Sequence, residues 1–137
     1  MRLYLIAPQS NAHTEYSRLS APGAPDGFIT RVASAAIATV AALAPPDFDV
    51  SLCDEAVQDV RYDTDADVVG ITANVSQAQR ALGIADAFRR LGKTVVMGGP
   101  HVSLAPELFE GRADSLVVGE LEPVAQDFVL AVFFTAG

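Results

Sequence analysis

The stretch from residue 67 to residue 120 limits the possible folds of this chain more than any other part. It contains three short apolar runs separated by two segments of helical character. The runs are rich in valine and lack polar alternation, which is typical of strands buried on both faces of a parallel sheet. The pattern therefore predicts strand–helix–strand–helix–strand, with strands at residues 67–71, 94–97 and 115–118.

The segment between the first two of these strands has a clear helical pattern. Ser76 followed by Gln79 predicts a capping-box start, and Gly92 predicts a left-handed end, so the helix spans residues 76–91. A second, short helix is expected at residues 106–109, because Pro106 suits a first helical turn. The expected apolar face of the longer helix recurs at helical spacing: Ala78, Ala81, Leu82, Ala85 and Phe88.

The flanking segments continue the alternation of strands and helices. Residues 2–7 are predicted as the first strand, ended by Pro8, and residues 9–29 as a long loop that is either a surface loop or a flap over the ligand edge. An alanine-rich helix, capped by Asp26 or Thr30, is expected to end near Leu43. Residues 48–53 form the second predicted strand, and a last helix is expected over residues 122–134.

Five strands alternating with helices leave few topologies, because crossover connections between parallel strands are right-handed. The simplest is a flavodoxin-like (Rossmann-like) doubly wound five-stranded parallel sheet, with strand order 2-1-3-4-5 and helices on both faces. The 137 residues suit one domain, so we expect residues 1–137 to form a single unit.

Charge and cysteine content exclude several functional classes. The net charge is −8 and no stretch is basic, which argues against nucleic-acid and anionic-membrane partners. The apolar run at residues 32–44 is too short to cross a bilayer. The single Cys53 excludes an internal disulfide, and also a cysteine-ligated zinc or iron–sulfur site built from this chain alone. We therefore expect a cytoplasmic location.

Three polar or glycine-bearing turns follow the predicted strands, at residues 72–74, 98–101 and 119–120. In an open parallel sheet such turns meet at the carboxyl edge, where these sheets bind ligands. A phosphorylated receiver is excluded, because Pro8, Thr72 and Glu120 stand where that class needs acids or a lysine. No G-x-G-x-x-G follows the first strand. The loop hydroxyls of Ser10 and Thr14 leave a flavin or nucleotide binder of flavodoxin type as an alternative.

The residues from 52 to 122 carry a resemblance to a known family. Its pieces are the acidic turn at residues 53–55, the segment ADVVGIT at 66–72, VVMGGPHV at 95–102 and ADSLVVGELE at 113–122. In this order and spacing they resemble the N-terminal cobalamin (B12)-binding-type domain of the B12-dependent radical SAM protein family. The remainder of the chain, residues 1–44, is similar only in its layout of strand, loop and helix.

The resemblance implies where a cofactor would lie. In this family the corrin ring lies across the carboxyl edge and the nucleotide tail descends beside the sheet. Gly98 and Gly99 would give the tail room and backbone N–H groups, and Gly119 would let the corrin approach. No catalytic residue and no protein ligand to a metal is expected in this chain. The implied cofactor-binding residues are Pro8, Ser10, Asp54, Glu55, Ala56, Thr72, Asn74, Ser76, Gly98, Gly99, Pro100, Gly119 and Glu120.

One turn departs from related B12 domains, which carry D-x-H-x-x-G with a histidine that ligates cobalt. Here residues 54–59 read DEAVQD, so Ala56 replaces the histidine and Asp59 the glycine. Any bound cobalamin would lack that ligand. An alternative is therefore a degenerate module that binds no cofactor and acts as an interaction domain. His101 and Cys53 are expected to be structural, and His13 would approach a corrin only if the long loop closed over the edge.

The family's catalytic half is a barrel with a C-x-x-x-C-x-x-C motif for a [4Fe–4S] cluster, and this chain has no such motif. The resemblance thus implies a cobalamin-binding module that serves a radical SAM methyltransferase-like enzyme. S-adenosylmethionine and the [4Fe–4S] cluster would belong to a separate barrel domain or subunit. The apolar tail at residues 129–137 marks a possible truncation point, and predicts a partner or a homo-oligomer that covers it.

Overall fold

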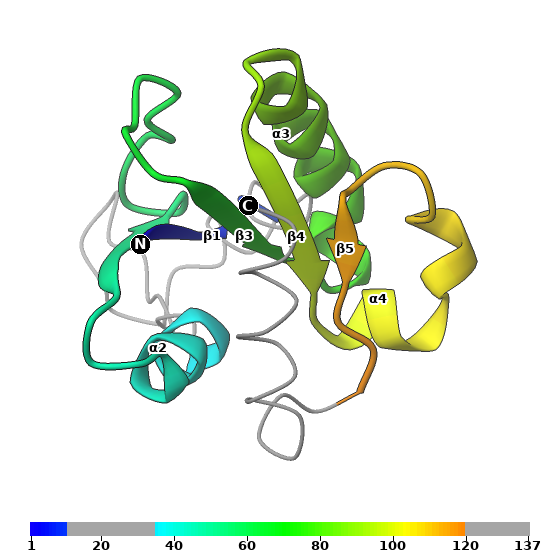
Figure 1. Ribbon diagram of the computed structural model, residues 1–137. Coiled ribbons are helices and arrows are strands. Elements are labelled where there is room, and N and C mark those ends of the chain that lie inside the picture. The colour runs from blue at the N-terminus through cyan, green and yellow to red at the C-terminus, as the bar shows by residue number, and fades with distance from the viewer. Residues whose placement is uncertain (11–34, 120–137) are drawn as a thin grey trace, which may run out of the picture.

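The computed structural model describes residues 1–10 and 35–119 (Figure 1). Five parallel strands form one sheet in the order β2-β1-β3-β4-β5, which confirms the predicted topology. The strands are β1 (Arg2–Ala7), β2 (Asp49–Asp54), β3 (Val68–Thr72), β4 (Thr94–Gly98) and β5 (Ser115–Leu116), and the helices are α2 (Ala35–Leu43), α3 (Ala78–Arg90) and α4 (Pro100–Leu104).

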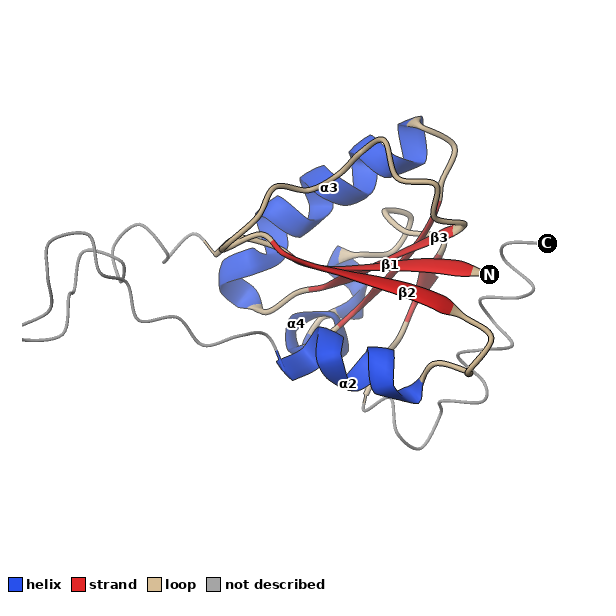
Figure 2. Ribbon diagram, turned by 90° about the vertical axis from the view of Figure 1, so that its left-hand side faces the viewer, coloured by secondary structure: helices blue, strands red, loops and turns tan. Residues whose placement is uncertain are grey.

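The central strands β1, β3 and β4 are buried on both faces, whereas the edge strand β2 is largely exposed. Alternate residues of β1, β3 and β4 point to opposite faces. One set packs with α3 and α4, and the other packs with α2. Figure 2 shows α3 on one side of the sheet and α2 on the other. The face covered by α2 carries Leu3, Leu5, Val68 and Val96, which cluster with Ile37; the opposite face carries Tyr4, Ile6, Val69, Ile71, Val95 and Met97, which cluster with Phe88 and Val102.

Helix α3 begins differently from the prediction. The capping box is formed by Asn74 and Gln77, not by Ser76 and Gln79. The Asn74 side chain accepts a hydrogen bond from the Gln77 N–H at 3.0 Å, and the Gln77 side chain accepts one from the Asn74 N–H at 3.1 Å. Asn74 is extended and comes directly after β3, so the backbone turns there and a 3-10 turn, Val75–Gln77, leads into α3. The buried face includes Ile84, which the pattern did not include.

The segment after β4 is helical where a turn was predicted. Gly99 has a φ of 109°, and Pro100 begins α4, a position in which its fixed φ suits a helix. The helix predicted at residues 106–109 is only a 3-10 turn, Pro106–Leu108. Strand β5 is also two residues shorter than predicted. Several predictions lie outside the described residues. They are residues 11–29 of the long loop, Asp26 and Thr30 as caps of the alanine-rich helix, the last helix and the apolar tail.

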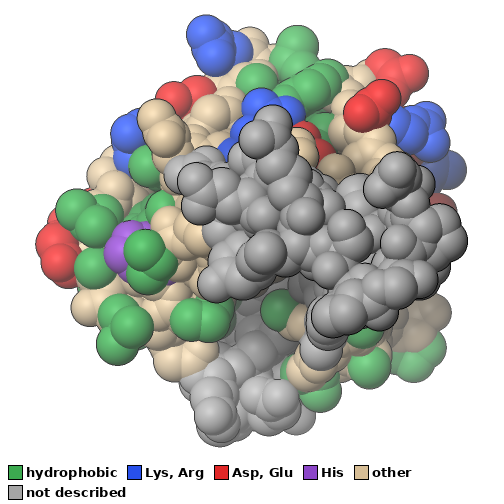
Figure 3. All heavy atoms as spheres, turned by 180° about the vertical axis from the view of Figure 1, so that it is seen from behind, with side chains coloured by type: hydrophobic (Ala, Val, Ile, Leu, Met, Phe, Trp, Pro, Cys, Tyr) green, Lys and Arg blue, Asp and Glu red, His purple; other side chains and the backbone are tan. Residues whose placement is uncertain are grey.

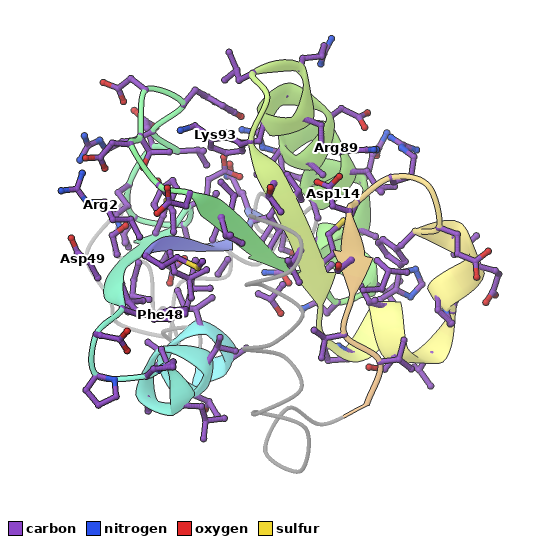
Figure 4. All side chains as sticks on the ribbon, viewed as in Figure 1. Arg2, Phe48, Asp49, Arg89, Lys93 and Asp114 are labelled. Carbon is purple, nitrogen blue, oxygen red and sulfur yellow. The ribbon has the colours of Figure 1, made fainter. Side chains whose placement is uncertain are left out.

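The amino edge of the sheet is occupied by ion pairs and backbone contacts. Arg2 pairs with Asp49 at 3.7 Å, and Arg89 pairs with Asp114 at 3.8 Å, as Figure 4 shows. Lys93 donates to the Ala66 carbonyl oxygen at 2.9 Å. These charged groups therefore serve the fold itself, and as exposed pairs they contribute little to stability. In the part of the chain that the structure describes, no helix is long and apolar enough to cross a membrane.

Candidate ligand-binding site

A cavity of about 270 Å³ lies between α2 and the sheet. Its walls come from β1, β3 and β4 on one side and from α2 on the other, and it reaches the carboxyl ends of β3 and β4. Across the sheet, Leu5 is the register partner of Gly70, and Gly70 is the partner of Val96. The lining also includes Ile37, Val40, Thr39, Thr72, Gly98, Gly99, Val117 and Gly119.

Two glycines, Gly70 and Gly98, lie among the strand residues that line this cavity. A Cβ on Gly70 would lie 2.7 Å from Leu5 Cδ2, and a Cβ on Gly98 would lie 3.4 Å from Val117 Cβ. Both residues are on strands and face α2. The Leu5 side chain covers Gly70, and Gly98 lines the cavity next to Val117. Thr72 and Gly98 were predicted for the site and are register partners at its edge. Gly70 was missed, although a glycine inside a buried strand often marks a close approach of a ligand.

Gly99, predicted for the site, also has a structural role. It lies in the cavity wall, but a Cβ there would lie 2.7 Å from Thr72 Oγ1 and 2.8 Å from the Ala73 carbonyl oxygen. The space beside its Cα is therefore filled by the protein's own backbone. The neighbouring Ala73 N–H donates to the Gly98 carbonyl oxygen at 2.9 Å, and its carbonyl accepts from the His101 N–H at 3.1 Å. Gly99 thus allows α4 to pack against the end of β3.

Of the predicted residues in the turns after β4 and β5, the structure describes Pro100 and Gly119. Gly119 has a φ of 90°, lines the cavity and donates its N–H to Ser103 Oγ at 2.9 Å. Pro100 is exposed at the first turn of α4 and does not line the cavity. Glu120 lies outside the described residues.

Four predicted residues come together at the start of α3. Ser10 Oγ donates to Ser76 Oγ at 2.7 Å, and Ser76 Oγ donates to Asn74 Oδ1 at 2.7 Å. The Pro8 carbonyl oxygen accepts from Gln77 Nε2 at 2.8 Å. The polar groups in this cluster bond to one another, so it fixes the chain that leaves β1 against the start of α3. Gln77 is part of this cluster and was missed by the sequence prediction.

Glu55 joins three parts of the carboxyl edge. Its carboxylate accepts hydrogen bonds from two Arg80 nitrogens, from Nε at 2.9 and 3.1 Å and from Nη2 at 2.6 Å, and one more from the Gln9 N–H at 2.9 Å. The Glu55 side chain is only 8% exposed, while that of Arg80 is 44% exposed. The hydrogen bonds from Arg80 lower the pKa of Glu55 in spite of its burial. Glu55 therefore acts as a structural link, and Arg80 is a second residue that the sequence prediction missed.

The acidic turn after β2 holds its shape through local hydrogen bonds. Asp54 Oδ1 accepts from the Ala56 N–H at 3.0 Å. The turn therefore keeps a defined shape with an alanine at position 56. Cys53 is buried and donates to the Asp59 carbonyl oxygen at 3.7 Å, and burial raises the pKa of its thiol. A structural thiol was expected here.

His101 and nearby apolar groups complete this edge. The His101 ring packs edge-on against Phe109, with ring centroids 5.4 Å apart, as suits a structural histidine. Large hydrophobic side chains are exposed on the segments that follow β3, β4 and β5, namely Val75, Leu104, Leu108 and Val118. Figure 3 shows hydrophobic side chains at the surface of one face of the molecule. Within residues 1–10 and 35–119, no group of three or more His, Cys, Asp or Glu residues is arranged to hold a metal ion.

Comparison with known proteins gives a consistent set of relatives. Residues 28–129 match the family model of the B12 binding domain. The chain is 47% identical over 88 residues to a bacteriochlorophyllide d C-8(2)-methyltransferase and 33% identical over 96 residues to a bacteriochlorophyllide d C-12(1)-methyltransferase, both from Chlorobaculum tepidum. These matches cover 64% and 69% of this chain.

A third relative is an uncharacterized methyltransferase from Pyrococcus horikoshii, 31% identical over 109 residues. That match covers 70% of this chain and 24% of the relative. The two Chlorobaculum matches cover 20% and 21% of those proteins, so the chain spans about a fifth to a quarter of the length of these relatives. No solved structure gives a significant match.

Proposed function

The chain belongs to the family of B12-binding domains, and on this premise we propose that it binds cobalamin as the cofactor module of a methyltransferase-type enzyme. The observation that carries the proposal is the cavity under α2, which reaches the carboxyl ends of β3 and β4. Ligands of doubly wound sheets bind at this edge, next to the point where the strand order reverses between β1 and β3.

The residues present fit a cobalamin in two places. The cavity floor at Gly70 and Gly98 would receive part of the nucleotide tail, with the Thr72 hydroxyl beside it. The turn at residues 54–56 would lie beneath the corrin ring, with Gly119 at the ring's edge. When bound, cobalamin supplies a cobalt centre that can carry a methyl group. The role of this chain is to hold the tail, orient the ring and exclude water from the cavity.

The chemistry beyond cofactor binding is assigned to the remainder of a longer enzyme. Because the chain spans only about a fifth of the Chlorobaculum methyltransferases, a further domain or subunit would supply substrate recognition and catalysis. The resemblance to B12-dependent radical SAM proteins supports a barrel that holds S-adenosylmethionine and a [4Fe–4S] cluster. The single cysteine of this chain agrees with a cluster held elsewhere and with a reducing, cytoplasmic compartment.

A titration of the purified chain with hydroxocobalamin tests the proposal. We expect the corrinoid to co-elute with the protein on gel filtration and its visible spectrum to shift on binding. FMN serves as the control for the flavodoxin-type alternative, which the family match does not favour, and we expect no thermal shift with it. Failure of every corrinoid form to bind, also in the presence of the remaining domains, would exclude the proposal.

A second candidate is the degenerate module without cofactor. Ala56 and Asp59, which replace the histidine and the glycine of the D-x-H-x-x-G turn, favour it. The exposed hydrophobic side chains Leu104 and Leu108 would then contact a partner, and the apolar tail at residues 129–137 would form a homo-oligomer. This candidate predicts self-association or partner binding without any bound corrinoid, and a monodisperse monomer that binds cobalamin would exclude it.

An imidazole placed in the acidic turn tests how the corrin lies. We expect Ala56→His to change the visible spectrum of the bound corrinoid, because the turn would then offer a nitrogen ligand. The change should disappear only at a pH below about 6.5, the ordinary pKa of histidine, because coordination to cobalt competes with protonation of the same nitrogen. Ala56→Asn is the control, with a polar side chain of similar reach and no basic nitrogen. Identical spectra for both variants would show that the turn does not face the cobalt.

A further inference from the structure

The charged side chains at the amino edge of the sheet are separated by sign. The acidic side surrounds the starts of β1, β2 and β3, and its charged residues are Asp47, Asp49, Asp63, Asp65, Asp67, Arg2 and Arg61. The basic side surrounds the end of α3 and the start of β4, and its charged residues are Arg89, Arg90, Lys93, Arg112, Asp86 and Asp114. Five negative charges against two positive give the acidic side an excess of three negative charges, and four positive against two negative give the basic side an excess of two positive charges. Figure 4 labels Arg2 and Asp49 from the acidic side and Arg89 from the basic side.

The basic side is hollowed into a polar groove of about 690 Å³. Its lining residues other than Gly92 all carry a charge or a hydroxyl, and they are Asp86, Arg89, Arg90, Lys93, Thr94 and Asp114. Arg89 and Lys93 are held in place because each donates to a main-chain carbonyl oxygen, at 2.8 Å and at 2.9 Å. Arg90 is exposed at the end of α3. The groove therefore offers cationic side chains to an anionic group from outside.

The acidic side projects carboxylates into solvent. The side chains of Asp49, Asp63 and Asp65 are 78%, 84% and 74% exposed. Arg2 contacts Asp49 at 3.7 Å and also pairs with Asp65, and the Arg2 main-chain N–H donates to Asp67 Oδ2 at 2.8 Å. One arginine thus faces three carboxylates, so negative charge remains around the start of β1. Solvated surfaces usually intersperse the two signs, whereas the separation along this edge suits a partner that carries the opposite arrangement.

We propose that a second copy of this chain binds at the amino edge, with the two copies related by a two-fold axis. In such a contact the same surface of both copies meets, so the acidic side of each copy enters the basic groove of the other. The net charge of −8 makes most contacts between copies repulsive, and complementary patches then determine which surfaces meet. The contact is small and polar, so the dimer is transient. It leaves the carboxyl edge, where the cofactor is proposed to bind, free.

Sedimentation velocity of the purified chain, over a range of protein and salt concentrations, tests the proposal. We expect a monomer–dimer equilibrium at about 0.01 M salt, where charges act over about 30 Å, and a monomer at about 1 M salt, where they act over about 3 Å. A chain that stays monomeric at both salt concentrations, or that grows beyond a dimer, would overturn the proposal. Association that persists at the higher salt concentration would place the contact at an apolar surface, and would overturn it as well.

Two charge reversals identify the surfaces that meet. Arg90→Glu places a negative charge in the basic groove, and Asp63→Lys places a positive charge on the acidic side. Each variant alone should self-associate at least about tenfold more weakly, because attraction becomes repulsion at two equivalent places. An equimolar mixture of the two variants should dimerise again, since opposite charges then face each other at both places. A mixture that stays monomeric would contradict the two-fold arrangement.

Glu107→Lys is the matched control for Asp63→Lys. Both replacements exchange a carboxylate for an ammonium group and so change the net charge from −8 to −6, but Glu107 lies in the 3-10 turn that follows α4. We expect Glu107→Lys to dimerise at least as strongly as the wild type, because it lowers the overall repulsion between copies. If Asp63→Lys also dimerised more strongly than the wild type, net charge alone would govern association, and the proposed surfaces would be wrong.

Discussion

Gly98→Val is expected to lower the affinity for cobalamin by about 10- to 100-fold. Forcing extra methyl groups into a filled site costs about 1–3 kcal/mol, and 1.4 kcal/mol corresponds to a tenfold change in affinity. The position is suitable because the backbone of Gly98 is that of a regular strand with no positive φ. The new side chain would occupy the cavity next to Val117 without forcing the chain into a strained conformation. Titration with hydroxocobalamin measures the loss.

A graded series separates a filled cavity from a damaged fold. Gly98→Ala adds one methyl group at the distance of a tight contact, so its loss of affinity should be smaller than that of the valine variant. Gly83→Ala should leave binding unchanged and increase the free energy of unfolding by about 0.5–1 kcal/mol, because alanine favours a helix interior. Full affinity in a natively folded Gly98→Val variant would place the tail outside the cavity. Gly99 is unsuitable for this test, since any Cβ there meets Thr72 and Ala73.

The sheet was predictable because its signals are local. Residues 3–7, 68–71 and 95–97 in β1, β3 and β4 are apolar apart from the Tyr4 hydroxyl, and a parallel sheet covered on both faces buries such runs completely. The strand order then followed from the alternation with helices and from the handedness of crossovers. The unexpected α4 was missed because Gly99 at positive φ, and not an apolar pattern, decides where the chain turns.

The site was predictable only where it is formed by strand ends. Thr72 and Gly98 follow directly from the strand positions, and the structure places them side by side. Gly70, Gln77 and Arg80 were missed for a physical reason. Their roles depend on contacts with Leu5, Pro8 and Glu55, which lie far away in the sequence and become neighbours only when the sheet and α3 have packed. Ser10 and Ser76 lie at one edge, and their hydroxyls are bonded to each other.

Glu55→Gln is expected to destabilise the folded chain by about 1–2 kcal/mol at pH 7. Hydrogen bonds to charged groups contribute about 1.5–3 kcal/mol, and the removal of one partner from a fully buried ion pair costs about 3–5 kcal/mol. We expect a loss smaller than that for a fully buried pair, because the Arg80 side chain is almost half exposed and water can solvate it. Urea denaturation of the variant and the wild type measures the difference.

The pH dependence of this difference identifies its cause. Arg80 lowers the pKa of Glu55 in the folded state below its ordinary value of 4.5, so the carboxylate stabilises the fold above that pH. This contribution is lost as the pH falls through the lowered pKa, and the stabilities of wild type and variant should then converge. Asp86→Asn is the matched control, because it breaks the exposed pair with Arg112 and should change stability by less than about 1 kcal/mol.

A double-mutant cycle with Arg80→Gln completes the test of the Glu55 link. If the two charges act as a pair, the double variant should lose less stability than the sum of the two single losses. The hydrogen bond from the Gln9 N–H gives a second readout, since Glu55 also holds the chain that leaves β1. We expect faster amide exchange at Gln9 in Glu55→Gln than in Arg80→Gln. Additive losses with unchanged exchange at Gln9 would show that the carboxyl edge is held by the Pro8–Gln77 and Ser10–Ser76 contacts alone.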